Sequence, residues 1–248
     1  MDTQRQASLP GCHGVSIAEL VRCAVHNSES SSGEDLVLLP SLLRLVGMRR
    51  PRRRAGTFVE LGANDGITSS NTLMLERCCN WTGPLIEGNP SNFAALQSSG
   101  RRSQTFHRAI CSGGPSHINI SVGGGLFAGM PETRTAAKVS RQASLRAHGV
   151  ALVQCDSLEQ ILQDSGQPSQ SQLDFLSLDV EGAEELVLGT VDPARFKLVM
   201  FESNMLSRAA QDRVHKRMLL AGHVRAMQLE PWASNVYVHL NASAAAEL

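Results

Sequence analysis

Acidic side chains that directly follow apolar segments are the first candidates for chemistry in this sequence. Residues 57–61 form a short apolar run that contains Glu60, and a turn-forming segment follows with the order Gly62, Asn64, Gly66. A glycine at the end of a strand permits a tight turn and a close approach of a ligand to the backbone. Asn64 stands where a dinucleotide-binding loop has its middle glycine, and a pyrophosphate needs that glycine. The pattern therefore favours a ligand without phosphates.

A second acid lies at the end of the next apolar run, residues 84–86. Glu87 comes roughly twenty residues after the first loop, where an acid of a nucleotide-binding fold meets the ribose. One carboxylate has two oxygens and can accept hydrogen bonds from both hydroxyls of a ribose diol. Taken singly, Glu60 and Glu87 are more simply explained as caps of the helices that follow them. Their order and spacing together favour a nucleoside site.

A third group of acids follows two later apolar runs. Asp179, Glu181 and Glu184 come after residues 173–178, and Glu202 ends residues 197–202. In an open parallel sheet ligands lie outside the carboxyl ends of the strands, so these acids are expected to face the same cleft as Glu60 and Glu87. Compensation of helix dipoles and a Mg²⁺ site are the alternatives. We expect no metal.

The apolar runs alternate with helix-compatible segments, which predicts an α/β fold. Expected helices lie at 71–77 and after Ser207, which can cap a helix that Gly222 ends. The expected strands are residues 57–61, 84–86, 103–111, 173–178, 197–202, 225–229 and 235–240, with an antiparallel edge strand at 117–122.

Several separated motifs, in order, resemble the FkbM family of S-adenosylmethionine-dependent methyltransferases. They are residues 58–66, 70–72, 81–83, 86–90 and 178–184, and the resemblance runs from about Thr57 to Leu240. It implies a class I methyltransferase fold, a Rossmann-like three-layer α/β sandwich with a mostly parallel seven-stranded sheet and an antiparallel last strand. It also implies S-adenosyl-L-methionine as cofactor and, usually, O-methylation.

Site residues follow from the same resemblance. Four residues would surround the methionine part of the cofactor: Glu60, Gly62, Asn64 and Gly66. Glu87 would bind its ribose, and Ala109 and Ile110 would flank its adenine. The candidate bases for a hydroxyl acceptor are Asp179, Glu181 and Glu202. Weaker candidates, each in or beside an expected strand, are His107, His223 and His239.

Two rival functions stay open at this point. A nicotinamide oxidoreductase shares the first loop and the ribose acid, but it should have a glycine in place of Asn64. A non-catalytic relative that keeps the fold as an interaction module is the other rival. The methyl acceptor is of unknown class (sugar, lipid, small metabolite or protein), and the oligomeric state is equally open.

Charge and hydropathy restrict the partners. The 248 residues contain 23 Lys plus Arg and 23 Asp plus Glu, so no overall field attracts nucleic acid or an anionic membrane. Residues 36–48 are apolar but too few to span a bilayer, and no secretory signal is evident. We expect a soluble protein of the cytoplasm or an organelle. The expected division is an N-terminal extension, residues 1–54, that ends in the Arg-rich linker 49–54, and a methyltransferase domain, residues 55–248.

Six cysteines occur without any CxxC spacing, and Cys78 and Cys79 are adjacent. Adjacent cysteines are poorly placed to bridge one another, so we expect mostly reduced thiols. Three Asn-x-Ser/Thr sequons begin at Asn80, Asn119 and Asn241. Such triplets are common by chance and matter only in a secreted chain.

Overall fold

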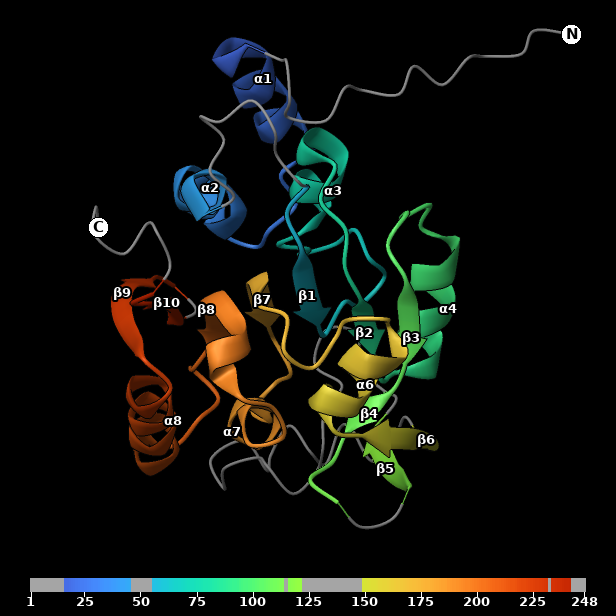
Figure 1. Ribbon diagram of the computed structural model, residues 1–248. Coiled ribbons are helices and arrows are strands. Elements are labelled where there is room, and N and C mark those ends of the chain that lie inside the picture. Colours follow the sequence, from blue (N-terminus) through green and yellow to red (C-terminus); the bar gives the residue numbers. More distant parts are fainter. Residues whose placement is uncertain (1–15, 46–54, 114–115, 122–148, 232, 242–248) are drawn as a thin grey trace, which may run out of the picture.

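A computed structural model describes residues 16–45, 55–113, 116–121, 149–231 and 233–241. Its main sheet has seven strands in the order β3-β2-β1-β7-β8-β10-β9 (Figure 1). The strands are β1 (Phe58–Leu61), β2 (Leu85–Glu87), β3 (Thr105–His107), β7 (Leu173–Leu178), β8 (Phe196–Glu202), β9 (His223–Leu229) and β10 (Ser234–His239). The pairs β3–β2, β2–β1, β1–β7 and β7–β8 are parallel, whereas β10 pairs antiparallel with both β8 and β9. The predicted mostly parallel sheet with a reversed last strand is confirmed.

A second, three-stranded sheet has the order β4-β6-β5. It consists of β4 (Ala109–Ile110), β5 (His117–Ser121) and β6 (Val150–Asp156). The strand expected over residues 103–111 is thus divided, because β3 pairs with β2 whereas β4 pairs with β6. The expected antiparallel edge strand is confirmed, since β5 pairs antiparallel with β6.

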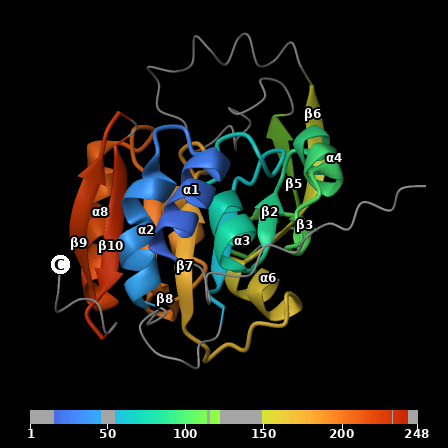
Figure 2. The ribbon, with the colours of Figure 1, turned by 90° about the horizontal axis from the view of Figure 1, so that it is seen from above.

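Helices cover both faces of the main sheet (Figures 1 and 2). One hydrophobic cluster contains side chains of the first four helices, α1 (Ile17–Asn27), α2 (Glu34–Leu45), α3 (Leu73–Cys79) and α4 (Pro90–Ser98). Another contains side chains of α6 (Leu158–Asp164), α7 (Glu184–Leu188) and α8 (Arg208–Leu220). A 3₁₀ turn, η4 (Pro193–Arg195), precedes β8. As predicted, Ser207 caps α8 through a hydrogen bond from the Ala210 backbone N–H.

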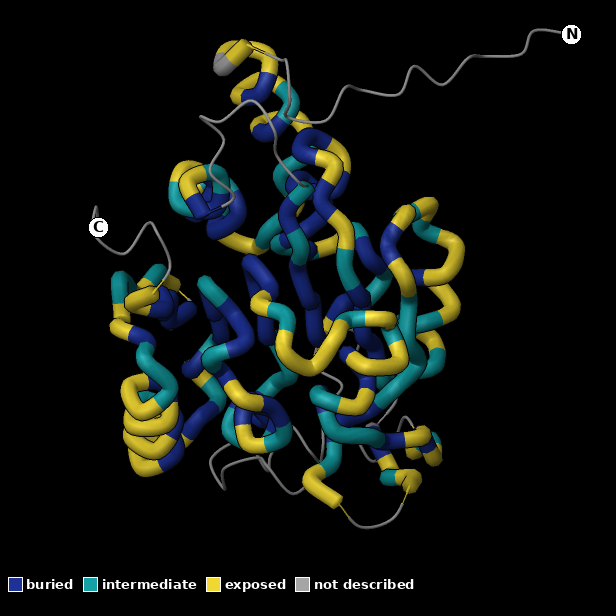
Figure 3. The backbone as a smooth tube through the Cα atoms, viewed as in Figure 1, coloured by how far each residue is buried: buried dark blue, intermediate teal, exposed yellow. Residues whose placement is uncertain are grey.

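Alternation along the strands assigns their side chains to the two clusters. Phe58 and Phe175 pack in the first cluster, while their neighbours Val59 and Leu176 pack in the second. The central strands are buried on both faces, as Figure 3 shows. A sheet buried in this way needs a helical layer on each side, and the result is the three-layer class I methyltransferase fold.

The helices before residue 54 pack directly on this core. Leu20 of α1 and Leu42 of α2 belong to the same cluster as Phe58 of the central strand β1. A boundary at residue 54 stays a prediction, and the Arg-rich run 49–54 lies outside the described residues. None of the described helices is long and apolar enough to cross a membrane.

The expectation of reduced thiols is wrong. Cys23 of α1 is bonded to Cys78 of α3 with their Cα atoms 5.8 Å apart, and Cys111 is bonded to Cys155 of β6 at 5.6 Å. Cys79 is disulfide-bonded too, and no cysteine within the described ranges is free. Adjacent residues of a helix point in different directions, so Cys78 and Cys79 each reach a partner elsewhere in the chain.

Candidate functional site

The loop after β1 lies against the end of β7 because residue 62 is a glycine. Gly62 has φ +77°, and a Cβ there would stand 1.8 Å from the carbonyl oxygen of Asp179. The Asp179 backbone N–H also donates to the carbonyl of Leu61 at 3.1 Å. Glycine at position 62 therefore allows the ends of β1 and β7 to lie in close contact. Gly66, at φ +80°, similarly faces Leu96 of α4.

Glu87 joins the first loop to the end of β2. One carboxylate oxygen accepts from the Asn64 backbone N–H at 2.8 Å, and the other accepts from the Asn89 backbone N–H at 2.7 Å. The side chain is buried, and this burial raises the pKa of Glu87 to about 7. Each oxygen keeps a second lone pair. The structure thus brings the predicted loop and the predicted ribose acid together.

The two residues predicted to flank adenine lie on β4, next to the Glu87 strand end. The carbonyl of Glu87 accepts from the Arg108 backbone N–H at 3.2 Å, and Gly88 faces the Cα of Ala109. Ala109 and Ile110 are both buried, and Ile110 packs in the cluster that contains α6. Ala109 is thus the nearer of the two to Glu87.

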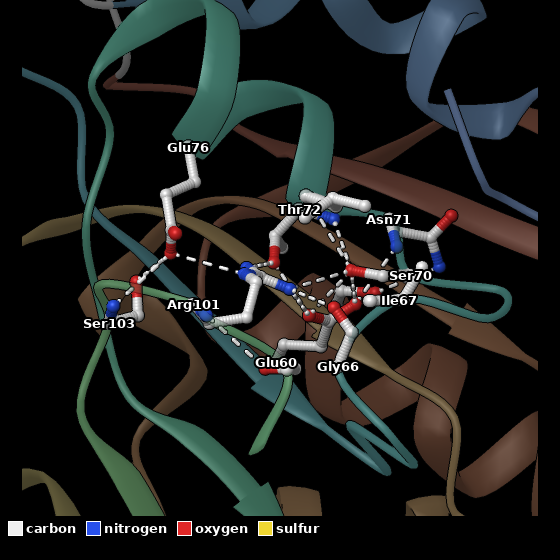
Figure 4. A network of polar contacts seen from close by, with 12 residues as sticks. Glu60, Gly66, Ile67, Ser70, Asn71, Thr72, Glu76, Arg101 and Ser103 are labelled. Atoms are coloured by element: carbon white, nitrogen blue, oxygen red, sulfur yellow. Dashed lines mark hydrogen bonds and ion pairs between the residues drawn. The ribbon is translucent and has the colours of Figure 1, made fainter. Parts of the chain in front are cut away.

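Glu60 is occupied within the protein (Figure 4). Its carboxylate accepts from the Ser70 hydroxyl at 3.0 Å, the Asn71 backbone N–H at 2.9 Å and the Thr72 hydroxyl at 2.6 Å. The Arg101 guanidinium lies 3.6 Å from the same carboxylate. These contacts hold the segment that leads into α3, and the place of Glu60 beside the cofactor stays a prediction.

Arg101 is the central residue of this network, and the sequence offered no sign of it. Its side chain is 1% exposed and lies between Glu60 and Glu76, with the Glu76 ion pair at 3.2 Å. It also donates to the carbonyl of Gly66 at 2.7 Å and to the Thr72 hydroxyl at 2.8 Å (Figure 4). One buried cation therefore ties the glycine loop to the start of α3.

A pocket opens at the carboxyl edge of the main sheet. It is small and partly open to solvent, with about 20 Å³ of space that a water-sized molecule can reach. The end of β7, the end of β8, the start of β10, the β1–α3 loop and the residues around the start of α2 line it. The lining residues are Ser31, Glu34, Ser69, Asn71, Leu178, Asp179, Met200, Glu202 and Ser234. Sequence reasoning missed Ser31 and Glu34, because nothing local connects them with a site more than a hundred residues away.

Asp179 and Glu202 form a coupled carboxyl pair in this pocket. Burial raises the pKa of Glu202 to about 9, and the charge of Asp179 adds to this rise. Burial also raises the pKa of Asp179, where a hydrogen bond from Glu202 opposes the rise and the charge of Glu34 adds to it. Asp179 Oδ1 is buried and has no hydrogen-bond partner within the described residues. With its raised pKa, Glu202 holds a proton at neutral pH, and Asp179 presents a buried acceptor atom beside it.

The other predicted acids shape the loop after β7. Glu184 accepts from the backbone N–H groups of Val180 at 3.3 Å and Gly182 at 3.1 Å, and burial raises its pKa to about 7. Glu181 takes a left-handed conformation, φ 57°, in the same loop, and it does not line the pocket. Of the three predicted bases, Asp179 and Glu202 therefore come together.

The three histidines belong to the scaffold. His223 is buried, its Nε2 contacts the carbonyl of Phe196 at 2.9 Å, and burial lowers its pKa to about 4. His239 packs edge-on against His223, while His107 stacks on Phe93. No group of three or more His, Cys, Asp or Glu suited to a metal ion occurs in the part of the chain that the structure describes.

The comparison with solved structures finds matches of low sequence identity. Similar solved structures include a Staphylococcus aureus protein provisionally assigned as a caffeoyl-CoA O-methyltransferase, with 10% identity, TM-score 0.46 and coverage of 91% of this chain and 92% of that chain. The human methyltransferase 10 domain containing protein has 10% identity and TM-score 0.43, with 91% and 99% covered. M. capricolum TrmK in complex with S-adenosyl-homocysteine has 10% identity and TM-score 0.37, with 91% and 68% covered.

The comparison with curated proteins gives no match. The family model of the methyltransferase FkbM domain matches residues 60–227, which is more than half of the chain. That range contains the loop after β1, Glu87 and the Asp179–Glu202 pair. The chain therefore belongs to the FkbM family of S-adenosylmethionine-dependent methyltransferases.

Proposed function

We propose that this methyltransferase methylates a hydroxyl oxygen and that Asp179 accepts the hydroxyl proton. The observation that carries the proposal is Asp179 Oδ1, a buried acceptor atom without a partner within the described residues, in a pocket at the carboxyl edge of the sheet. Ligands of open α/β sheets bind at this edge. A hydroxyl group is a weak nucleophile until a base takes its proton, and burial makes the Asp179 carboxylate a stronger base than an exposed one.

The residues present fit S-adenosylmethionine. The cofactor carries a sulfonium and an ammonium group, and the pocket contributes three carboxyl side chains, Glu34, Asp179 and Glu202, with no Lys or Arg in its lining. Glu87 offers carboxylate lone pairs for a ribose diol, and Ala109 lies beside it as an apolar neighbour for the base. Asn64 and Gly62 would form the backbone that borders the methionine part.

When it is bound, the cofactor supplies an electrophilic methyl group. The chain's own residues then orient the acceptor and manage one proton. Glu202 holds its proton up to about pH 9 and donates a hydrogen bond to Asp179, and Asp179 Oδ1 would accept from the hydroxyl group of the acceptor. The hydroxyl proton would move to Asp179, and the pocket residues would hold the acceptor oxygen close to the in-line geometry, which supplies much of the acceleration.

Charge also favours one kind of acceptor. The pocket lining offers no Lys or Arg to pair with a phosphate group, and the chain has a net charge of zero. Nucleic acid and other phosphate-rich acceptors are therefore disfavoured. We propose a neutral or cationic molecule that carries a hydroxyl group.

The cofactor proposal predicts a thermal shift. S-adenosylhomocysteine at about 100 times its Kd should add ~2.7 kcal/mol and raise Tm by roughly 5 to 11 °C for a chain of this size. The measurement is thermal unfolding with and without the ligand, with NAD as the matched control. An equal rise with NAD, or no rise with S-adenosylhomocysteine, would contradict the cofactor assignment.

The base assignment predicts unequal effects of two isosteric changes. Asp179→Asn removes the proton acceptor and should lower kcat by about 10² or more, while the affinity for S-adenosylhomocysteine stays within a few-fold. Glu202→Gln keeps a donor toward Asp179 and should lower kcat by about tenfold at most. The readout is labelled methyl transfer to the best hydroxyl compound of an acceptor screen. A larger loss in Glu202→Gln than in Asp179→Asn would assign the base to Glu202.

A further inference from the structure

We propose that Asn80 carries an N-linked glycan and that the chain acquires it in an oxidising compartment. Two independent features support this proposal: the disulfides, and the way in which the folded chain displays the sequon Asn80-Trp81-Thr82. It does not depend on the methyl acceptor or on the base.

The disulfides point to the compartment. Cys23–Cys78 crosslinks α1 to α3 in the first hydrophobic cluster, and Cys111–Cys155 crosslinks the segment after β4 to β6 in the small sheet. Two separate parts of the fold are thus crosslinked, and Cys79 is bonded as well. Disulfides persist in oxidising compartments and are rare where glutathione and thioredoxin keep thiols reduced. Of the two expected locations, the disulfides favour the oxidising lumen of an organelle over the cytoplasm.

The sequon itself is displayed for modification. Asn80 is the left-handed C-cap of α3 and is exposed, as is Thr82, while Trp81 between them is 1% exposed and anchors the segment in the core. The side-chain oxygen of Asn80 accepts from Arg102 at 2.7 Å, which leaves its Nδ2 for modification. Asn119 and Asn241 are exposed too, but the side chains of Ser121 and Ser243 lie outside the described residues.

The position of Asn80 is compatible with catalysis. Thr82 bridges to Thr57, and the Thr82 carbonyl accepts from the Phe58 backbone N–H at the start of β1. The sequon therefore lies at the amino edge of the sheet, whereas the pocket lies at the carboxyl edge. A glycan on Asn80 would leave the pocket open.

The modification transfers an oligosaccharide from a lipid diphosphate carrier to Asn80. A bond forms between Asn80 Nδ2 and the anomeric carbon of the first sugar, and the bond between that carbon and the diphosphate oxygen breaks. The amide loses one proton, and the lipid diphosphate leaves. Thr82 supplies the hydroxyl that defines the sequon.

The test uses the full chain produced in its natural host. Treatment with a peptide N-glycosidase, which hydrolyses the glycosylated side-chain amide, in heavy-oxygen water and then non-reducing peptide mapping should convert Asn80 to a labelled Asp and recover Cys23 linked to Cys78. Unmodified Asn80 in untreated protein, or alkylation of Cys23 and Cys78 without reduction, would overturn the proposal.

Sequon variants assign the site. Asn80→Gln and Thr82→Ala should each remove one glycan, seen as one step in gel mobility, whereas the conservative Thr82→Ser should keep it. Binding of S-adenosylhomocysteine should stay at the wild-type level in all three, which separates loss of the glycan from loss of the fold. If Thr82→Ala keeps every mobility step of the wild type, Asn80 is not the modified residue.

Discussion

Replacing Arg101 by alanine is expected to remove about 3–5 kcal/mol of folding stability, a large part of what a domain has. The guanidinium is 1% exposed and neutralises two buried carboxylates, Glu60 at 3.6 Å and Glu76 at 3.2 Å. Without it both acids stay buried and lose their positive partner. The loop carbonyl of Gly66 and the hydroxyl of Thr72 lose a donor in the same step.

The neighbouring arginine provides a matched control. The side chain of Arg102 is 55% exposed and lies 4.0 Å from Glu76, so Arg102→Ala should cost about 1 kcal/mol or less. Urea unfolding of both variants at neutral pH gives the comparison. Equal losses of unfolding free energy in the two variants would show that the burial of Arg101 is not the reason for the loss of stability.

The loss in Arg101→Ala should also shrink in acid. In the wild type burial opposes ionisation of Glu76, but Arg101 and Ser103 hold the pKa of Glu76 below its usual value. Ionised Glu76 therefore stabilises the fold above the pKa that it has in the unfolded chain, and this stabilisation is lost as pH falls through the lower pKa of the folded state. In the variant the unpaired, buried Glu76 should have a raised pKa, and protonation should relieve it. The difference in unfolding free energy between wild type and variant is therefore expected to fall from pH 7 to pH 4. A difference that grows in acid would contradict the electrostatic explanation.

Local features of the sequence predicted the sheet and half of the site. Each parallel strand ends in a turn at the same edge, so the order of Gly62, Asn64 and Glu87 along the chain was enough to bring the loop and the acid together. These features involve only the neighbours of each residue and the general geometry of parallel sheets.

Contacts between residues far apart in the sequence could not be predicted from these local features. Cys23 and Cys78 are separated by 55 residues, and the Arg101–Glu60 contact joins two different turns. The ion pair between Arg101 and Glu60 could not be predicted, because no local pattern reveals that the Arg101 side chain is buried. Glu34 reaches the pocket only because α2 packs on the sheet beside β7 and β8, a result of tertiary packing.

Glu87→Ala is expected to weaken S-adenosylhomocysteine binding by about 10²- to 10⁴-fold. Two hydrogen bonds from ribose hydroxyls to a carboxylate contribute about 1.5–3 kcal/mol each, which corresponds to that range of affinity. The change also frees the backbone N–H groups of Asn64 and Asn89, so part of the loss could come from the loop. Calorimetric titration with S-adenosylhomocysteine and with its 2′-deoxy analogue separates the two. The wild type should prefer the complete ribose, and the variant should bind both ligands equally weakly.

The pH dependence of S-adenosylhomocysteine binding tests independently whether Glu87 binds the ribose. Burial raises the pKa of Glu87 to about 7 in the ligand-free protein. The contribution of Glu87 to folding stability is therefore greatest below the pKa that Glu87 has in the unfolded chain, and it is lost as pH rises through 7. Ribose hydroxyls donate to the ionised carboxylate and stabilise it, so the affinity for S-adenosylhomocysteine should rise between pH 6 and pH 8 and then level off. Glu184 has the same raised pKa of about 7 but bonds only to loop N–H groups, so Glu184→Gln should keep most of that rise. If the rise disappears in Glu184→Gln and survives in Glu87→Ala, the titrating carboxylate is Glu184 and the ribose acid must be sought elsewhere.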